Sequence, residues 1–136
     1  MDQPRILIVD DDPMIRRLLQ VNFRLEGFDV AVAGRGEEAL ELAAGARPDI
    51  VVLDVSMPDM DGWEVMGRLR GDPPTASVPV VFLTARTGQT EQEKAQRLGA
   101  DGYLVKPFDP GELVEVVKQV LSDADPADAQ PDPGSS

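Results

Sequence analysis

The sequence predicts an α/β fold, a doubly wound sheet of parallel strands with helices on both faces. Five short runs rich in Val, Ile and Leu alternate with five longer helical patterns over residues 5–121. This alternation is typical of βα units that build a parallel sheet. Three of the runs are almost wholly apolar, as strands are when helices cover both faces of the sheet.

The apolar runs distinguish the middle of the predicted sheet from its edge. The predicted strands are residues 5–10, 28–33, 49–54, 78–84 and 102–106. The first, third and fourth runs are nearly continuous in apolar residues, which favours central positions. The second run, FDVAVA, is more polar, which indicates an edge strand.

Helical periodicity and turn residues define the segments between the strands. The predicted helices are residues 13–26, 37–44, 62–70, 89–98 and 110–121. Asp12 is a suitable N-cap for the first helix, and Gly27 and Gly45 are expected to end the first and second. Right-handed crossovers restrict the topology, and we predict the flavodoxin-like strand order 2-1-3-4-5.

Composition excludes several classes of function. The chain has no Cys and no His, so disulfides, thiolate metal sites and an internal phosphohistidine are all ruled out. The net charge of −12 argues against direct binding of nucleic acid, which needs a basic face. The N-terminal sequence resembles neither a signal peptide nor a membrane span, so we expect a cytoplasmic protein.

The C-terminal segment differs from the rest of the chain. Residues 123–136 contain four aspartates, no Lys or Arg and no large apolar residue. Such a segment cannot offset the entropy lost on ordering. We therefore predict one domain over residues 1–122, followed by a disordered acidic tail rich in Pro and Asp over residues 123–136.

Polar side chains follow four of the predicted strands. The first strand leads to Asp10 and Asp11, the third to Asp54, the fourth to Thr84 and the fifth to Lys106. The carboxyl ends of parallel strands share one edge of the sheet, where ligands of such folds bind. We therefore expect these five side chains to converge.

The chemistry of this set is that of phosphoryl transfer. Clustered carboxylates repel one another unless a cation joins them, and oxygen ligands without Cys or His suit a hard ion such as Mg²⁺. Lys106 supplies a mobile positive charge for a phosphoryl oxygen, and Thr84 supplies a hydroxyl donor. A nucleophile, a metal, a cation and a donor together make a phosphoryl-transfer site.

Four segments in order resemble the response-regulator receiver family of two-component signalling. They are ILIVDDDPMIRRLL, DIVVLDVSMPDMDGWEV, VVFLTA and GYLVKPF. The resemblance implies that Asp54 is the phosphorylated nucleophile. It also implies that Asp11 binds Mg²⁺ directly, Asp10 binds it mainly through water, and the carbonyl of Ser56 completes the ligand set with Asp54.

The same resemblance implies how the phosphorylated state is recognised. Lys106 would contact the phosphoryl group, and Thr84 would donate a hydrogen bond to it. Tyr103 would be the switch aromatic that turns inward as Thr84 moves. The peptide bond before Pro107 is expected to be cis, a form that X–Pro bonds adopt readily.

The expected role is a switch rather than an enzyme, although the chain would catalyse its own phosphorylation and a slow autodephosphorylation. The expected donor is a phosphohistidine on a histidine kinase or a histidine phosphotransfer protein. The change would spread over residues 89–98 and 103–121 and would control an unknown downstream protein or an output domain. We expect a monomer or a phosphorylation-dependent dimer.

Plainer interpretations and rival functions exist for single residues. Asp12 is more suited to capping the first helix than to binding metal, and Tyr103 could be plain core. A phosphatase of the haloacid-dehalogenase type would use Asp10 as nucleophile and Asp12 as acid/base, but only Asp109 lies between Lys106 and the last predicted helix to supply its late acidic pair. A flavodoxin would need Ser, Thr and Gly where this chain has Asp-Asp-Asp-Pro, and a receiver without phosphorylation would lack part of the acidic set.

The first helix carries Met14, Val21 and Leu25 beside its main apolar stripe, which includes Leu18. These residues could make the core face of the helix broader. Alternatively, Met14 and Leu18 could form an exposed surface on which a helix of the kinase docks.

Overall fold

A computed structural model describes residues 3–85 and 89–124, and its strands form a single parallel sheet. The strands are β1 (Arg5–Val9), β2 (Asp29–Ala33), β3 (Ile50–Asp54), β4 (Val80–Thr84) and β5 (Gly102–Val105). Their order across the sheet is β2-β1-β3-β4-β5, and every neighbouring pair is parallel. The predicted fold and strand order are confirmed.

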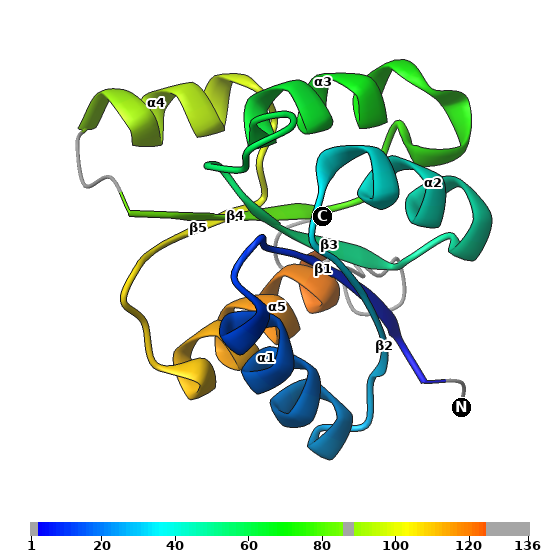
Figure 1. Cartoon of the computed structure of the whole chain (residues 1–136), viewed down its shortest axis with the longest axis vertical. Coiled ribbons are helices and arrows are strands. Elements are labelled where there is room, and N and C mark those ends of the chain that lie inside the picture. Colours follow the sequence, from blue (N-terminus) through cyan, green and yellow to red (C-terminus); the bar gives the residue numbers. More distant parts are fainter. Residues whose placement is uncertain (1–2, 86–88, 125–136) are drawn as a thin grey trace, which may run out of the picture.

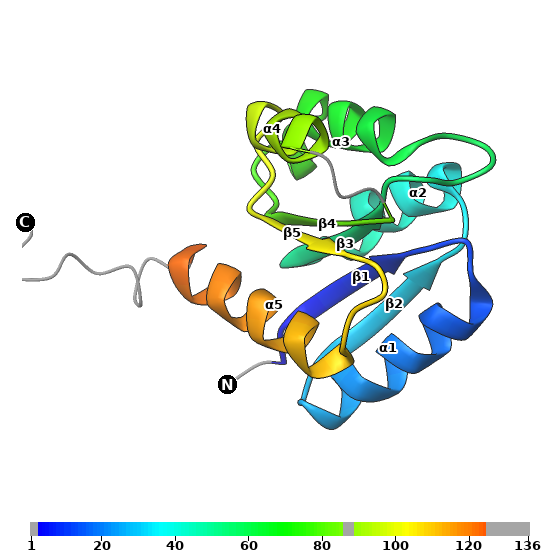
Figure 2. The ribbon, with the colours of Figure 1, turned by 90° about the vertical axis from the view of Figure 1, so that its left-hand side faces the viewer.

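Helices cover both faces of the sheet (Figure 1). They are α1 (Pro13–Leu25), α2 (Gly36–Ala46), α3 (Gly62–Gly71), α4 (Gln89–Arg97) and α5 (Pro110–Ala124), with a short 3₁₀ turn at Pro73–Thr75. Figure 2 shows α1 and α5 against one face and α2, α3 and α4 against the other. The strands therefore pass through the middle layer of a three-layer molecule.

Alternating side chains of the central strands build a core on each face. Leu7, Leu53 and Phe82 belong to the core under α2, α3 and α4. Ile8, Val52 and Leu83 belong to the core under α1 and α5. Every residue of β3 and β4 is buried, whereas the edge strand β2 begins with the exposed Asp29. Both findings agree with the predicted positions of these strands.

The predicted caps of the first helix are confirmed, but the predicted end of the second is wrong. The Asp12 carboxylate accepts a hydrogen bond from the Met14 N–H at 2.9 Å, and Gly27 follows α1 with a φ of 92°. Helix α2 does not stop at Gly45 but continues to Ala46, and Arg47 takes the left-handed conformation with a φ of 50°. Pro48 disfavours the right-handed α conformation at Arg47, so the chain turns there instead.

The last helix runs further than the sequence pattern indicated. Helix α5 extends to Ala124, so Asp123 and Ala124, which the prediction assigns to the tail, are helical. Residues 125–136 of the predicted tail lie outside the described residues. Among the helices described, none is both long enough and apolar enough to cross a membrane.

Candidate functional site

Three carboxylates meet at the carboxyl edge of the sheet. Asp10 and Asp11 follow β1, and Asp54 ends β3, which pairs directly with β1. One oxygen atom from each of the three lies within 4.8 Å of the other two. Asp10 and Asp54 are buried, whereas Asp11 is exposed. The sheet topology therefore produces the acidic cluster that the strand ends predicted.

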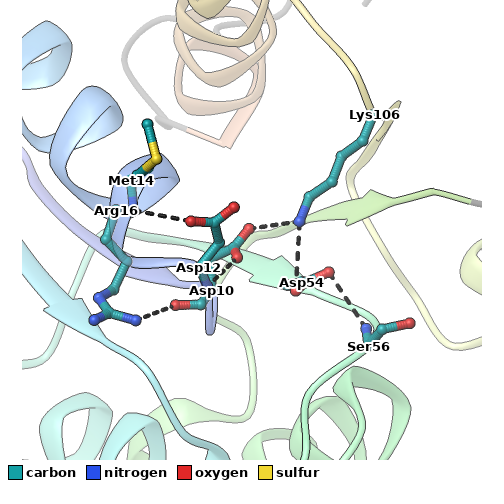
Figure 3. Close-up of polar contacts among 7 residues, drawn as sticks. All are labelled: Asp10, Asp12, Met14, Arg16, Asp54, Ser56 and Lys106. Carbon is teal, nitrogen blue, oxygen red and sulfur yellow. Dashed lines mark hydrogen bonds and ion pairs between the residues drawn. The ribbon is translucent and has the colours of Figure 1, made fainter.

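Lys106 reaches into this cluster from the segment after β5 (Figure 3). Its Nζ lies 2.7 Å from Oδ2 of Asp10 and 3.5 Å from Oδ2 of Asp54. The peptide bond between Lys106 and Pro107 is cis, as expected. The Lys106 N–H also donates to the Thr84 carbonyl at 2.7 Å. This bond connects the segment after β5 to the end of β4, whose last residue, Thr84, is buried. Leu83, the residue before Thr84, is paired with Asp54 of β3.

The loop after β3 holds Asp54 from the other side. The Ser56 N–H donates to Oδ1 of Asp54 at 3.3 Å (Figure 3), and the Gly62 N–H donates to the Val55 carbonyl at 2.7 Å. Helix α3 approaches so closely that a Cβ on Gly62 would lie 2.5 Å from the Asp54 carbonyl oxygen. The position therefore requires a glycine for space.

The same loop also caps a neighbouring helix. The Asp59 carboxylate accepts hydrogen bonds from the N–H groups of Gly36 and Glu37, at 3.0 and 3.3 Å. These bonds lower the pKa of Asp59, the one to Gly36 contributing most. The N-cap residue of α2, Arg35, makes no side-chain cap bond of its own. Asp59 therefore fixes the loop after Asp54 to the start of α2.

Burial makes the charge of Asp54 unfavourable. Desolvation, followed by repulsion from Asp10, raises its pKa to about 7, although Lys106 and the Ser56 N–H act in the opposite direction. Burial lowers the pKa of Lys106, but its contacts with Asp10 and Asp54 outweigh burial and leave that pKa above its usual value. One lysine thus offsets only part of the negative charge of three carboxylates.

The residues present fit a hard divalent cation. Their ligand atoms are carboxylate oxygens with the spacing of a metal site, and such oxygens are the ligands that Mg²⁺ prefers. Among the described residues, Oδ2 of Asp10 is buried, accepts no well-aligned hydrogen bond and forms an ion pair with Lys106. A second positive charge at this edge would relieve the remaining repulsion.

The other predicted site residue, Tyr103, belongs to β5 and precedes Lys106 by three residues. It is half-buried in β5, opposite Phe82 of β4, and it packs against the core under α2, α3 and α4.

A surface pocket beside the cluster is lined in part by Asp11, Ser56, Met57 and Trp63. The Trp63 ring contacts Phe82, with ring centroids 4.6 Å apart, and Lys94 Nζ lies 4.8 Å from the Trp63 centroid.

Sequence reasoning missed Arg16, which contacts the main chain of the cluster. Its Nη1 donates to the Asp10 carbonyl oxygen at 2.8 Å (Figure 3). In the sequence, Arg16 is one of two adjacent arginines on the polar side of an amphipathic helix, which is the pattern of solvated residues. The one local signal is Gly34 at the end of the second strand, where a missing side chain leaves room for the guanidinium.

Comparison with known proteins assigns the family. The family model described as "Response regulator receiver domain" matches residues 6–118. The DNA-binding response regulator MtrA of Mycolicibacterium smegmatis is 45% identical over 117 residues, which are 86% of this chain and 50% of the relative. The regulator RpaA of Synechocystis, described as a DNA-binding dual master transcriptional regulator, is 45% identical over 90% of this chain and 51% of its own.

Among solved structures of similar fold, the match extends over almost the whole length of the solved chain. Chemotaxis protein CheY4 of Vibrio cholerae matches with a TM-score of 0.83 and 34% identity, over 87% of this chain and 98% of that one. A CheY-like receiver domain protein of Methanospirillum hungatei matches with a TM-score of 0.83 and 27% identity, over 90% and 96%. This chain spans about half the length of the regulators MtrA and RpaA. These matches agree with the fold and with the acidic cluster at the carboxyl edge of the sheet. The chain therefore belongs to the response regulator receiver domain family, the signalling switches of two-component systems.

Proposed function

We propose that this receiver accepts a phosphoryl group on Asp54 from a phosphohistidine, in a reaction that requires Mg²⁺. One observation carries the proposal: the Asp54 carboxylate is buried at the end of β3, with Asp10, Asp11 and Lys106 all directed toward it. The phosphohistidine would belong to a histidine kinase or a histidine phosphotransfer protein, because this chain has no histidine.

The transfer is a displacement at phosphorus. An oxygen of Asp54 forms the new P–O bond while the P–N bond to the donor imidazole breaks, and the imidazole nitrogen keeps that electron pair. Lys106 lies 3.5 Å from Asp54, within reach of a phosphoryl oxygen there. Bound Mg²⁺ would neutralise charge on the carboxylates and on the phosphoryl oxygens. Asp10, Asp11, Asp54 and the Ser56 carbonyl would hold it.

The response would be a shift between two conformations. A phosphoryl group that bonds to Thr84 and Lys106 in one state only would favour that state by the difference in contacts. Thr84 ends β4, and Tyr103 lies on the neighbouring edge strand β5, which connects α4 to α5 along the chain. We propose this α4–β5–α5 face as the surface that changes and controls a downstream protein or output domain.

The DNA binding in the names of MtrA and RpaA belongs to those longer proteins. For the residues of this chain, the net charge of −12 supports a partner protein or an attached domain, rather than nucleic acid, as the direct contact. The oligomeric state proposed is a monomer, or a dimer formed on phosphorylation.

The phosphodonor is proposed to dock on α1. Met14, Leu18, Val21 and Leu25 form an apolar stripe along this helix with exposures of 79, 47, 50 and 81%. Met14 lies in the first turn of α1, two residues after Asp12 (Figure 3). A helix of the donor protein that covers this stripe would stand beside Asp54.

Mass spectrometry with acetyl phosphate and Mg²⁺ tests the proposed nucleophile. The wild-type chain should gain one phosphoryl mass, and Asp54→Asn should gain none. Asp12→Asn is the control, because Asn also caps a helix and the change removes a nearby charge without touching the nucleophile. A phosphoryl mass that persists in Asp54→Asn would refute the assignment of the nucleophile. A label that forms equally well in EDTA would refute the requirement for Mg²⁺.

A further inference from the structure

Arg16 folds back from α1 onto the end of β1. Its Nη1 donates to the Asp10 carbonyl oxygen at 2.8 Å (Figure 3), and its side chain is half-buried. That oxygen belongs to the peptide group between Asp10 and Asp11. A hydrogen bond from a guanidinium is stronger than one between neutral groups, so it restricts the rotation of this peptide group.

The other polar groups of Asp10 are also held, whereas the Asp11 side chain is not. The Asp10 N–H donates to the Ala33 carbonyl at 3.1 Å, and Oδ1 accepts from the Asp12 N–H at 2.9 Å. Oδ2 pairs with Lys106 at 2.7 Å. Within the described part of the chain, the exposed Asp11 carboxylate makes no hydrogen bond or ion pair. The direction of Asp11 therefore depends on its main chain.

Gly34 provides the space that the guanidinium occupies. A Cβ on Gly34 would lie 2.6 Å from Nη1 of Arg16 and 3.1 Å from its Cζ. The φ of Gly34 does not lie in the left-handed region, so its backbone conformation does not require a glycine. The absence of a side chain at this position leaves the path from Arg16 to the Asp10 carbonyl open.

We propose that Arg16, accommodated by Gly34, is a positioning residue that orients the Asp10–Asp11 peptide group so that Asp11 can bind the divalent cation. This inference rests on the proposed function, because it needs the cation site. Arg16 contacts a carbonyl oxygen and no carboxylate of the cluster, so its effect on the site is through geometry rather than charge. Partners that orient metal ligands in this way typically alter metal affinity by about 10- to 100-fold.

Two variants remove the contact by different routes, and a neighbouring arginine supplies the control. Arg16→Met removes the donor. Gly34→Ala keeps Arg16 and its charge but places a methyl group 2.6 Å from Nη1, so the guanidinium must move from its present position. Arg17→Met removes the same charge one residue away, from an exposed side chain without a hydrogen bond or ion pair in the described structure.

Mg²⁺ affinity of the unphosphorylated chain, measured by isothermal titration calorimetry, is the readout. We expect Arg16→Met and Gly34→Ala each to weaken binding by about 10-fold or more, and Arg17→Met to leave it within about 2-fold of wild type. The double variant Arg16→Met/Gly34→Ala should bind no more weakly than Arg16→Met alone, because both changes remove one interaction. Thermal unfolding in EDTA records any separate loss of stability.

Each other outcome overturns the inference in a different way. Wild-type affinity in Arg16→Met would show that the contact only stabilises the fold, even if the melting temperature falls. Weak binding in Arg16→Met with normal binding in Gly34→Ala would show that Mg²⁺ binding needs Arg16 but not the position that its guanidinium takes here, which contradicts the positioning role. If Arg16→Met does not fold, Gly34→Ala decides alone. Absence of Mg²⁺ binding in the wild-type chain would instead refute the cation site of the proposed function.

Discussion

Asp54 is a carboxylate held where its negative charge is unfavourable. The side chain is almost fully buried, and Lys106, which forms an ion pair with it, is closer to Asp10 than to Asp54. Strong pKa perturbation of this kind is frequent at functional sites. Burial and repulsion from Asp10 raise the pKa of Asp54. The same two effects would favour the binding of a cation that offsets the excess negative charge, or the transfer of a group that removes it.

We predict that Asp54→Asn stabilises the metal-free chain, and more so at higher pH. Because the pKa of Asp54 is raised from 3.8 to about 7 in the folded state, its contribution to stability is fully present below pH 3.8 and is lost as the pH rises through 7. The variant has no such loss. Its advantage in the free energy of unfolding should therefore grow between pH 5 and pH 8, by up to about 3 kcal/mol.

Urea unfolding in EDTA at these two pH values measures this advantage. Asp72→Asn serves as a control, since Asp72 is an exposed aspartate outside the acidic cluster. An advantage of Asp54→Asn that stays the same at both pH values would contradict the prediction.

At the scale of single residues, the sequence predicts contacts that one segment makes with itself. Asp12 caps α1 through the Met14 N–H, two residues away, and the residue types alone indicated this. The contact of Arg16 with Asp10 is also short in sequence. It could not be predicted because it depends on the space left by Gly34, which reaches the site only after β2 pairs with β1.

At the scale of elements, α3 shows how space rather than helix propensity determines the role of a glycine. Gly62 begins this helix against the Asp54 carbonyl, whereas Gly67 lies in its exposed middle, where an added Cβ would meet no atom within 4 Å. Two glycines in one helix therefore have opposite sensitivity to an added methyl group.

We predict that Gly67→Ala stabilises the chain and that Gly62→Ala destabilises it. Alanine is favoured over glycine inside a helix by up to about 1 kcal/mol, and nothing opposes this gain at Gly67. At Gly62 the Cβ would meet main-chain atoms, which cannot move away as a flexible side chain could, so a loss of about 1–3 kcal/mol is expected. Chemical denaturation of both variants tests the pair, and equal effects of the two changes would contradict the steric explanation.

The predicted end of α2 shows what an element-scale pattern misses. Glycine is the usual residue after a helix, which favoured a stop at Gly45. The helix instead ends where Arg47 adopts a positive φ before Pro48, although arginine has no preference for that conformation. The start of α2 is also held by a residue far away in the sequence, because the Asp59 carboxylate accepts a hydrogen bond from the Gly36 N–H.

At the scale of the whole molecule, the parallel sheet explains why the site could be predicted at all. Asp10, Asp54 and Lys106 are far apart in the sequence, but each follows or ends a strand, and carboxyl ends of parallel strands lie at one edge. The parallel arrangement of the strands therefore brings these side chains together, and their closeness can be predicted without knowing the contacts between them. The α1 stripe was open to two interpretations from the sequence, and burial shows that Met14 and Leu18 are exposed.

We predict that Met14→Gln/Leu18→Gln slows phosphorylation by a phosphohistidine donor protein at least about 10-fold, because the apolar area that the donor covers is lost. Labelling by acetyl phosphate should be unchanged, since this small donor needs no docking surface. Leu98→Gln, which alters an exposed apolar residue after α4, is the control. The rate of phosphorylation by each donor is measured by separating the phosphorylated chain from the unphosphorylated chain. Equal slowing with both donors would indicate damage at Asp54 instead of a lost docking surface.

Trp63 gives the molecule an optical property. It is the single tryptophan of the chain, and its indole contacts both the ring of Phe82 on β4 and the ammonium group of Lys94 on α4. The wavelength and yield of indole emission depend on a charge so near the ring. If α4 shifts when Asp54 is modified, as proposed, Lys94 moves relative to a fixed chromophore. The unlabelled chain should then signal its own conversion as a change in ultraviolet fluorescence, in real time and at micromolar concentration.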